Sequence, residues 1–388
     1  MTEWKEYKLG EIAEIITGYP FPGDKYESTG NLRVVRGENI TIGNLRWDTE
    51  KHWNHETEGL EKYFLQSGDI VIGMDGSRVG DNRAKVKQVD LPLILAQRVA
   101  CLRAKKEFSQ DYLWYTIFSD NFKKYIEAIH TGTSIPHISQ KQIEDFEILC
   151  PPLPTQRRIA SILSSLDDKI DLLHRENATL EQMAETLFRQ WFVVEAKKEW
   201  EEGKLGGWVV IKRGGSPRPI NDYISSSGYR WLKISDVTNL NSPYIFQTKE
   251  YIKESGLQKT VYLSTGSLVL SNSATPGIPK ILCVDSCIHD GWLYFPKSSF
   301  SKIYLYLLFK YIREDLVNLG NGSIFTNLKT DILKDYKVVK PDSKTLEKFD
   351  YQVQPIFDKL YSNDIQIQTL IQTRDGLLPR LMGGEIKI

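Results

Sequence analysis

A glycine-rich stretch near residue 75 carries side chains that can bind the edges of nucleotide bases. The segment GMDGSRVGD (residues 73–81) follows an alternating apolar run that predicts a strand. Its glycines permit close approach to another backbone. Arginine can pair with guanine, asparagine with adenine, and aspartate with the amino group of cytosine. A DNA-contacting loop is one interpretation, and an ordinary polar hairpin is the other. The candidate contacts are Asp75, Ser77, Arg78, Asn82 and Arg83.

Three further loops carry similar side chains. The segment SNSATPGIPK (271–280) offers a comparable polar set, and TGTSIPH (131–137) and GNGSIFTN (320–327) form a second pair of glycine-containing loops. Pro136-His137 could equally be a turn whose hydrogen bonds are satisfied internally. The candidates from 271–280 are Asn272, Ser273, Thr275 and Lys280. Those from the other pair are Thr133, Ser134, His137, Ser323, Thr326 and Asn327.

Patterns typical of catalytic or metal sites are absent from the sequence. The glycine-rich stretch lacks the Gly-Lys-Ser/Thr of a phosphate-binding loop and the Gly-x-Gly-x-x-Gly of a dinucleotide site. The segment Cys150-Pro151-Pro152-Leu153 lacks the amide or carboxylate and the aromatic residue of an adenine methyltransferase motif. Cys283, Cys287 and His289 lack a second ligand pair at zinc spacing. We expect no catalytic residue, no metal ion and no enzymatic activity in this chain.

The sequence contains an internal repeat of about half its length, at offsets of 190 to 198 residues. The turn-strand segment SGDIVIGMDG (67–76) recurs as TGSLVLSNSA (265–274), and SIPHISQKQIEDFEILCPP recurs as SIFTNLKTDILKDYKVVKPD. Each copy has turn-rich, strand-rich sequence followed by one long helical pattern. We therefore predict an α+β protein with two tandem α/β heads and two long helices. The predicted parts are residues 1–150, 151–202, 203–341 and 342–388.

Both helical segments begin after a proline break and carry an apolar stripe at alternating steps of four and three residues, which is typical of a coiled coil. An asparagine interrupts the stripe in each copy, at Asn177 and Asn363. We predict that the two helices pair as an antiparallel coiled coil with approximate two-fold symmetry, so that the heads lie at opposite ends. The stripe contains Leu163, Leu166, Ile170, Leu173, Leu180, Leu187, Val353, Ile356, Leu360, Ile367, Leu370 and Leu377.

Composition fits a folded, soluble protein. Apolar residues make up 41% of the chain and charged residues 26%, and no apolar stretch is long enough to span a bilayer. Four cysteines suit a reducing compartment, so we expect a cytoplasmic location. Net charge is zero, but residues 203–340 carry 18 basic and 10 acidic side chains, and residues 78–106 carry eight basic against two acidic. These local excesses could face phosphates or simply be solvated.

Two segments resemble a known family, the specificity subunits of type I restriction-modification systems. They are FEILCPPLPTQRRIASILSSLDDKIDLL (146–173), similar to the family's central conserved segment, and QTLIQTRDGLLPRLMGGEI (368–386). Thr155-Gln156 stands where the family often has Glu-Gln, and the second copy has Thr345-Leu346. The resemblance extends over essentially the whole chain.

The resemblance implies that each head is a target recognition domain for one half of a bipartite double-stranded DNA site. The helices would dock two adenine-N6 methyltransferase subunits, which restriction and translocase subunits join in defence against foreign DNA. S-adenosylmethionine, ATP and Mg²⁺ would bind to those partners and not to this chain. The alternative is a non-catalytic duplicated coiled-coil adaptor without DNA affinity.

Overall fold

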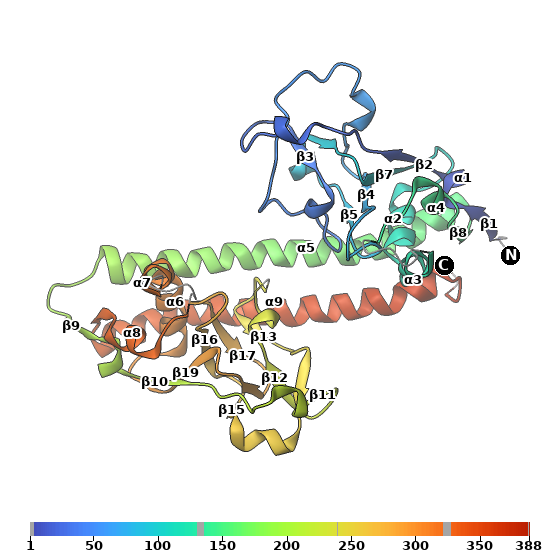
Figure 1. Cartoon of the computed structure of the whole chain (residues 1–388). Coiled ribbons are helices and arrows are strands. Elements are labelled where there is room, and N and C mark those ends of the chain that lie inside the picture. Colours follow the sequence, from blue (N-terminus) through green and yellow to red (C-terminus); the bar gives the residue numbers. More distant parts are fainter. Residues whose placement is uncertain (1–3, 130–135, 239, 321–326, 387) are drawn as a thin grey trace. The chain divides into compact units, whose positions relative to one another are not determined.

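The computed structural model describes residues 4–129, 136–238, 240–320, 327–386 and 388. The chain divides into two compact units, one of Met1–Ile170 with Thr369–Ile388 and the other of Asp171–Gln368. Each unit contains one head and segments of both long helices, which are the green and red rods of Figure 1.

The first head is built on a four-stranded antiparallel sheet with the order β2-β7-β4-β5. These strands are β2 (Ala13–Thr17), β7 (Val99–Ala104), β4 (Ile70–Gly73) and β5 (Arg83–Lys85). Two strand pairs accompany it, the parallel pair β3 (Arg33–Val35) and β6 (Leu93–Leu95) and the antiparallel pair β1 (Lys5–Lys8) and β8 (Glu147–Cys150). Its helices are α1 (Leu9–Ile12), α2 (Gln110–Phe118), α3 (Asp120–Ile129) and α4 (Gln140–Glu144).

The second head has two five-stranded sheets and a strand pair. One sheet is β10 (Val209–Arg213), β19 (Trp292–Ser298), β16 (Leu268–Ser271), β17 (Pro279–Leu282) and β13 (Tyr244–Ile245). The other is β11 (Ile224–Ser225), β14 (Glu250–Ile252), β12 (Tyr229–Leu232), β18 (Ser286–Ile288) and β15 (Val261–Leu263). The pair is β9 (Glu201–Lys204) with β20 (Lys337–Lys340), and the helices are α6 (Lys302–Tyr311), α7 (Arg313–Gly320) and α8 (Thr330–Asp335).

The two heads share one topology, which confirms the predicted internal repeat and the α+β class. The strand order β2-β7-β4-β5 recurs as β10-β19-β16-β17. The parallel pair β3–β6 recurs as β12–β18, and the antiparallel pair β1–β8 as β9–β20. The helices α2, α3 and α4 stand in the same order as α6, α7 and α8. The scaffold is therefore used twice.

The long helices are α5 (Leu153–Arg189, 37 residues) and α9 (Ser343–Met382, 40 residues). Each begins within two residues of the expected proline break, and Pro154 is tolerated in the first turn of α5 because the N–H that proline lacks would have no partner within the helix there. Their pairing is antiparallel. In the first unit Arg374 Nη1 lies 2.8 Å from Asp167 Oδ1, and in the second unit Asn363 Nδ2 donates to Asn177 Oδ1 over 2.8 Å.

The predicted stripe lies at the contact between α5 and α9, and its residues fall into two groups by exposure. Six of its members are at most 7% exposed, namely Leu163, Ile170, Leu173, Val353, Leu360 and Ile367. The other six are half-buried, namely Leu166, Leu180, Leu187, Ile356, Leu370 and Leu377. Three of the half-buried members, Leu187, Ile356 and Leu377, are each followed by a residue that is at most 7% exposed. These residues are Phe188, Phe357 and Leu378. The buried apolar surface of a helix is therefore wider where the helix packs against its head as well as against the other helix.

Each head shares a hydrophobic core with the neighbouring helix segments. In the first unit Ile159, Leu163 and Leu378 pack in one cluster with Leu9 and Tyr112 of the head. In the second unit the corresponding cluster joins helix residues such as Phe188 and Phe349 to α6 and to the β10–β19–β16 sheet. A head is thus packed onto its helix segments and not attached through a linker alone.

We expect truncation of a fully buried stripe residue to destabilise the protein strongly. Leu163→Ala and Leu360→Ala, one in each unit, should each lower the free energy of unfolding by about 2 to 5 kcal/mol, because each leaves a cavity. Leu172→Ala is the matched control, since Leu172 is 48% exposed on the same helix as Leu163, and it should stay within about 0.5 kcal/mol of wild type. Urea denaturation measures all three. Wild-type stability in both Leu163→Ala and Leu360→Ala would contradict the burial of the stripe between the two helices.

Candidate nucleic-acid interface

The structure brings the two candidate loops of the first head together. Ile138 N donates to Met74 O over 2.9 Å, and Gly76 N donates to Pro136 O over 3.1 Å. The segment after β4 therefore runs beside the segment that contains His137. Met74 N in turn donates to Arg98 O over 2.9 Å, so the start of β7 also meets these two segments. We call this meeting point of residues 74–76, 98 and 136–138 the corner of the head.

Asp75 links these three segments through its carboxylate. Oδ2 lies 2.8 Å from Arg98 Nη1, and Oδ1 bonds to His137 Nδ1. Arg98 has a φ of 65°, a left-handed conformation that is uncommon for a residue with a side chain and marks a constrained position. The side chains of Arg98 and His137 are nonetheless 70% and 57% exposed. The corner is held firmly and presents its polar groups to solvent.

A pocket of about 580 Å³ opens at this corner. Its lining includes Asp75, Ser77, Arg78, Asn82 and Arg98. On the other side, its lining includes Phe21, Tyr26, Arg36 and Glu38, and the Arg36 guanidinium lies 5.6 Å from the centre of the Tyr26 ring. Arginines and aromatic rings together can bind phosphates and stack on bases.

Arg83 is not available for such contact, and this sequence expectation is wrong. It lies in β5, is 4% exposed, and its Nη1 donates to Ile117 O at 2.5 Å and to Ser119 O at 3.1 Å. Burial lowers the pKa of its guanidinium, although neighbouring carboxylates oppose the shift. Arg83 is the first residue of β5, and its side chain turns inward to the carbonyls of Ile117 and Ser119 at the end of α2.

The second head forms the same corner with different side chains. Leu328 N donates to Asn272 O, and Asn272 N donates to Gly291 O, both over 2.8 Å. These bonds match those of Ile138 with Met74 and of Met74 with Arg98. The segments 271–280 and 327–328 therefore also lie side by side. Thr133, Ser134, Ser323 and Thr326 lie outside the described residues.

Two glycines confirm that the corners correspond. A Cβ on Gly18 would lie 2.0 Å from Ala96 O, and a Cβ on Gly214 would lie 2.2 Å from His289 O. Gly18 N donates to Val99 O as Gly214 N donates to Trp292 O. A side chain would prevent this approach, so each copy requires glycine here.

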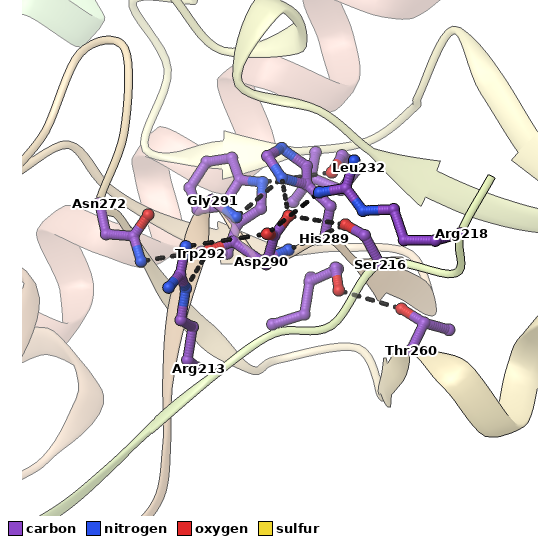
Figure 2. Close-up of polar contacts among 11 residues, drawn as sticks. Arg213, Ser216, Arg218, Leu232, Thr260, Asn272, His289, Asp290, Gly291 and Trp292 are labelled. Carbon is purple, nitrogen blue, oxygen red and sulfur yellow. Dashed lines mark hydrogen bonds and ion pairs between the residues drawn. The ribbon is translucent and has the colours of Figure 1, made fainter. Parts of the chain in front are cut away.

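The second corner is organised around Asp290 (Figure 2). Arg213 and Arg218 approach its Oδ2 at 3.8 and 3.5 Å, and Ser216 Oγ donates to its Oδ1 over 2.7 Å. Partial burial alone would raise the pKa of this carboxyl, but the hydrogen bond from Ser216 and the guanidinium groups bring the pKa below its usual value. Burial lowers the pKa of the adjacent His289. The carboxylate is therefore ionised at neutral pH.

Two candidate DNA contacts of the second head are buried, so their side chains are not available for such contact. Asn272 is 3% exposed, and its Nδ2 donates to Asp290 O over 3.3 Å. Lys280 is 5% exposed, and its Nζ donates to Leu240 O over 2.6 Å and to Ser242 O. Both side chains support the loops from within. Ser273 and Thr275 are half-buried, and Asn327 is exposed.

Sequence reasoning did not single out Arg36, Arg98, Arg213, Arg218 or Asp290. Arg98 lies in the basic stretch 78–106, and the two arginines of the second head contribute to the excess of positive charge in residues 203–340. That local charge was the available signal. The identity of the residues that meet at each corner depends on strand pairing.

The remaining sites of interest give no further candidate. Among the described residues, no group of three or more His, Cys, Asp and Glu side chains is arranged to hold a metal ion. Burial raises the pKa of the Cys287 thiol to about 11. Within the same residues, no helix has the length and apolar character needed to cross a membrane.

Comparison with known proteins decides the family. A family model described as the type I restriction modification DNA specificity domain matches residues 1–182 and again residues 197–373. The chain belongs to this family. It is therefore a DNA specificity subunit of the type I restriction-modification kind, as the segments 146–173 and 368–386 indicated. The alternative of an adaptor without DNA affinity finds no support in this match.

Relatives match along the full length of this specificity subunit. It is 24% identical over 430 residues to the MjaIX specificity subunit of Methanocaldococcus jannaschii, a match that covers 100% of this chain and 94% of the relative. It is also 24% identical over 477 residues to the HindI specificity subunit of Haemophilus influenzae, with 100% of each covered. A crystal structure of a type I S subunit from M. genitalium shares the fold, with a TM-score of 0.60 at 16% identity over 98% of this chain and 96% of that one.

The burial of Arg83 predicts opposite outcomes for two arginines of one hairpin. Arg83→Ala should lower the free energy of unfolding by about 2 kcal/mol or more, because the buried carbonyl of Ile117 and the part-buried carbonyl of Ser119 lose their donor. Arg78→Ala should leave stability unchanged, since Arg78 is exposed. Thermal melts of the two variants test this expectation. The assignment fails if Arg78→Ala is the less stable of the two.

The burial of Lys280 predicts a specific dependence of stability on pH. Desolvation lowers the pKa of Lys280 to about 8 in the native state, from its ordinary value of 10.5. Between these values the unfolded chain binds more protons, so the stability that depends on Lys280 rises with pH. Relative to Lys280→Met, wild type should gain about 2 kcal/mol between pH 7.5 and 9.5. Urea denaturation at both pH values measures the gain.

The exposed Lys249 supplies the control for that experiment. Relative to Lys249→Met, the stability of wild type should change little over the same pH range. An equal dependence on pH in the two comparisons would show that Lys280 is not a buried cation.

Proposed function

We propose that each head of this specificity subunit reads one half of a bipartite DNA site. The supporting observation is that one scaffold occurs twice, with corresponding corners that carry different polar side chains. The first corner presents Arg98, Asp75 and His137, and the second presents Arg213, Arg218 and Asp290. Because base identity is read by side chains, two different sets on one scaffold suit two different half-sites.

We further propose that the paired helices bind two modification subunits and set the spacing between the half-sites. Large apolar side chains on these helices are exposed, among them Leu172, Met183 and Tyr351 at 48%, 50% and 86%. Exposed apolar surface of this kind marks protein contacts. Restriction and translocase subunits would join this complex.

The chemistry is assigned to the partner subunits. The modification subunits would bind S-adenosylmethionine and methylate adenine at N6, and the restriction subunits would bind ATP and Mg²⁺. This chain would select the DNA sequence without a catalytic residue of its own. We propose a cytoplasmic location, where the DNA is accessible and the four free cysteines stay reduced.

Exchange of one head tests the two-reader arrangement. Residues 1–150 are replaced by the corresponding head of a relative, while both helices are kept, and the chimera is produced with its modification subunit. Sequencing of methylated bases in the host genome should show one half of the recognised motif changed, with the other half and the spacer retained. The reason is that each head carries its own corner.

The reciprocal chimera, with residues 201–340 exchanged, is the matched control and should change only the other half. A change in both halves on exchange of a single head would contradict the proposal. Methylation that is indifferent to either exchange would show that neither head reads sequence.

A further inference from the structure

The cluster around Asp290 has the properties of a base-reading contact. Arg213 ends β10, Arg218 follows five residues later, and Asp290 lies on the loop before β19. Arg213 Nε donates to Asp290 O over 2.5 Å, so this arginine is held by both the backbone and the carboxylate of Asp290. Figure 2 shows both guanidinium groups directed at this one residue. The cluster joins two segments more than 70 residues apart in the sequence.

The exposure of this cluster argues against a purely structural role. The side chains of Arg213 and Arg218 are 54% and 73% exposed, and that of Asp290 is 40% exposed. Ion pairs this open to solvent contribute little to stability. By contrast, the structural arginine of the first head, Arg83, is buried. Arg213 is held by its hydrogen bond to Asp290 O, and both guanidinium groups remain accessible to a ligand.

The loop beneath the cluster is held tightly. Asn272, a buried residue directly after β16, donates to Asp290 O over 3.3 Å, and its Oδ1 has no hydrogen-bond partner within the described part of the chain. Gly291 N donates to His289 Nδ1 over 2.8 Å. A Cβ on Gly291 would lie 2.2 Å from His289 Cε1 and 2.6 Å from Ser273 Oγ. A contact fixed in this way loses little entropy when it binds.

The combination of donors and acceptor matches a G·C pair. In the major groove, guanine presents two adjacent acceptors, O6 and N7, which suit the paired donors of a guanidinium group. Its cytosine presents an amino donor, which a carboxylate can accept. An A·T pair places the N6 donor of adenine between two acceptors, so a guanidinium fork would meet a donor. A phosphate could pair with the guanidinium groups, but it has no donor for the Asp290 carboxylate to accept.

We propose that Arg213 and Arg218, positioned by Asp290, read a G·C base pair in the half-site of the second head. This inference rests on the proposed function and adds to it the residues and the base pair. Ser216 acts as a positioning residue, through its hydrogen bond to Asp290.

The test uses the complex of the full chain with its modification subunit on a library of duplexes with randomised bases. Wild type, Arg213→Ala, Arg218→Ala and the two Lys variants at these positions are compared by sequencing the bound DNA. We expect the preference for G·C at one or two positions of one half-site to fall about 5- to 100-fold in the alanine variants. The other half-site should be unchanged, and melting temperatures should stay within about 1 °C of wild type, because exposed ion pairs add little to stability.

The lysine variants separate base reading from charge. Lysine keeps the positive charge but lacks the paired N–H donors of a guanidinium group. Arg213→Lys and Arg218→Lys should therefore also lose the preference for G·C. Lys297→Ala is the control, since Lys297 is exposed toward the far end of β19, and it should retain the wild-type preference. Asp290→Asn should weaken the preference at the same positions as the alanine variants.

Two results would overturn this inference while leaving the proposed function intact. One is binding that weakens equally for all sequences in the alanine variants, while the slope of log K against log salt concentration falls by about one per arginine. That result would identify both arginines as phosphate contacts. The other is an unchanged preference in all of the variants. A wild-type complex that selects no sequence from the library would instead refute the proposed function itself.

Discussion

The burial of one apolar stripe between α5 and α9 is the interaction on which the rest of the structure depends. Neither helix could keep residues such as Leu163 or Leu360 from water by itself, and each buries them against the other. A polar layer interrupts the stripe, where Asn177 bonds to Asn363 and Asp364. Burial raises the pKa of the Asp364 carboxyl, so ionisation of this one group opposes folding at neutral pH. Polar residues within such a stripe are known to fix register, and we assign that role to this layer.

The heads depend on the same stripe because their cores continue into it. In the first unit Tyr115 of α2 donates to Asp167 of α5 over 2.7 Å, and Asp167 also pairs with Arg374 of α9. In the second unit Tyr306 of α6 donates to Glu181 of α5 over 2.5 Å. One tyrosine from the equivalent helix of each head therefore bonds to a carboxylate on α5. These two bonds are not copies of each other, because alignment of Ser109 and Ser301, which cap α2 and α6, places Trp114 and not Tyr115 at the position of Tyr306.

The sequence predicted the architecture well and the interface only in part. Periodicity and repeats depend on local pattern, so both helices, the two heads and the stripe could be located without coordinates. The asparagines at 177 and 363 occupy different layers of the repeat, and only antiparallel pairing reveals that they meet. Arg83 and Lys280 were candidate contacts because they lie in or near glycine-containing loops, but each lies in a strand, β5 or β17, and is buried. Asp290 was missed because its partners are distant in the sequence.

Backbone hydrogen bonds of the same pattern occur in both corners, while the side chains that also hold each corner differ. Met74 with Arg98 and Asn272 with Gly291 pair through their N–H and C=O groups, and Gly18 and Gly214 are needed because they lack a side chain. Exposed side chains at the corners, such as Arg78 and Arg218, therefore contribute little to folding. Substitution at these exposed positions would change the side chains offered to DNA at little cost in stability. The recognised sequence can thus change during evolution while the backbone hydrogen bonds of each corner are kept.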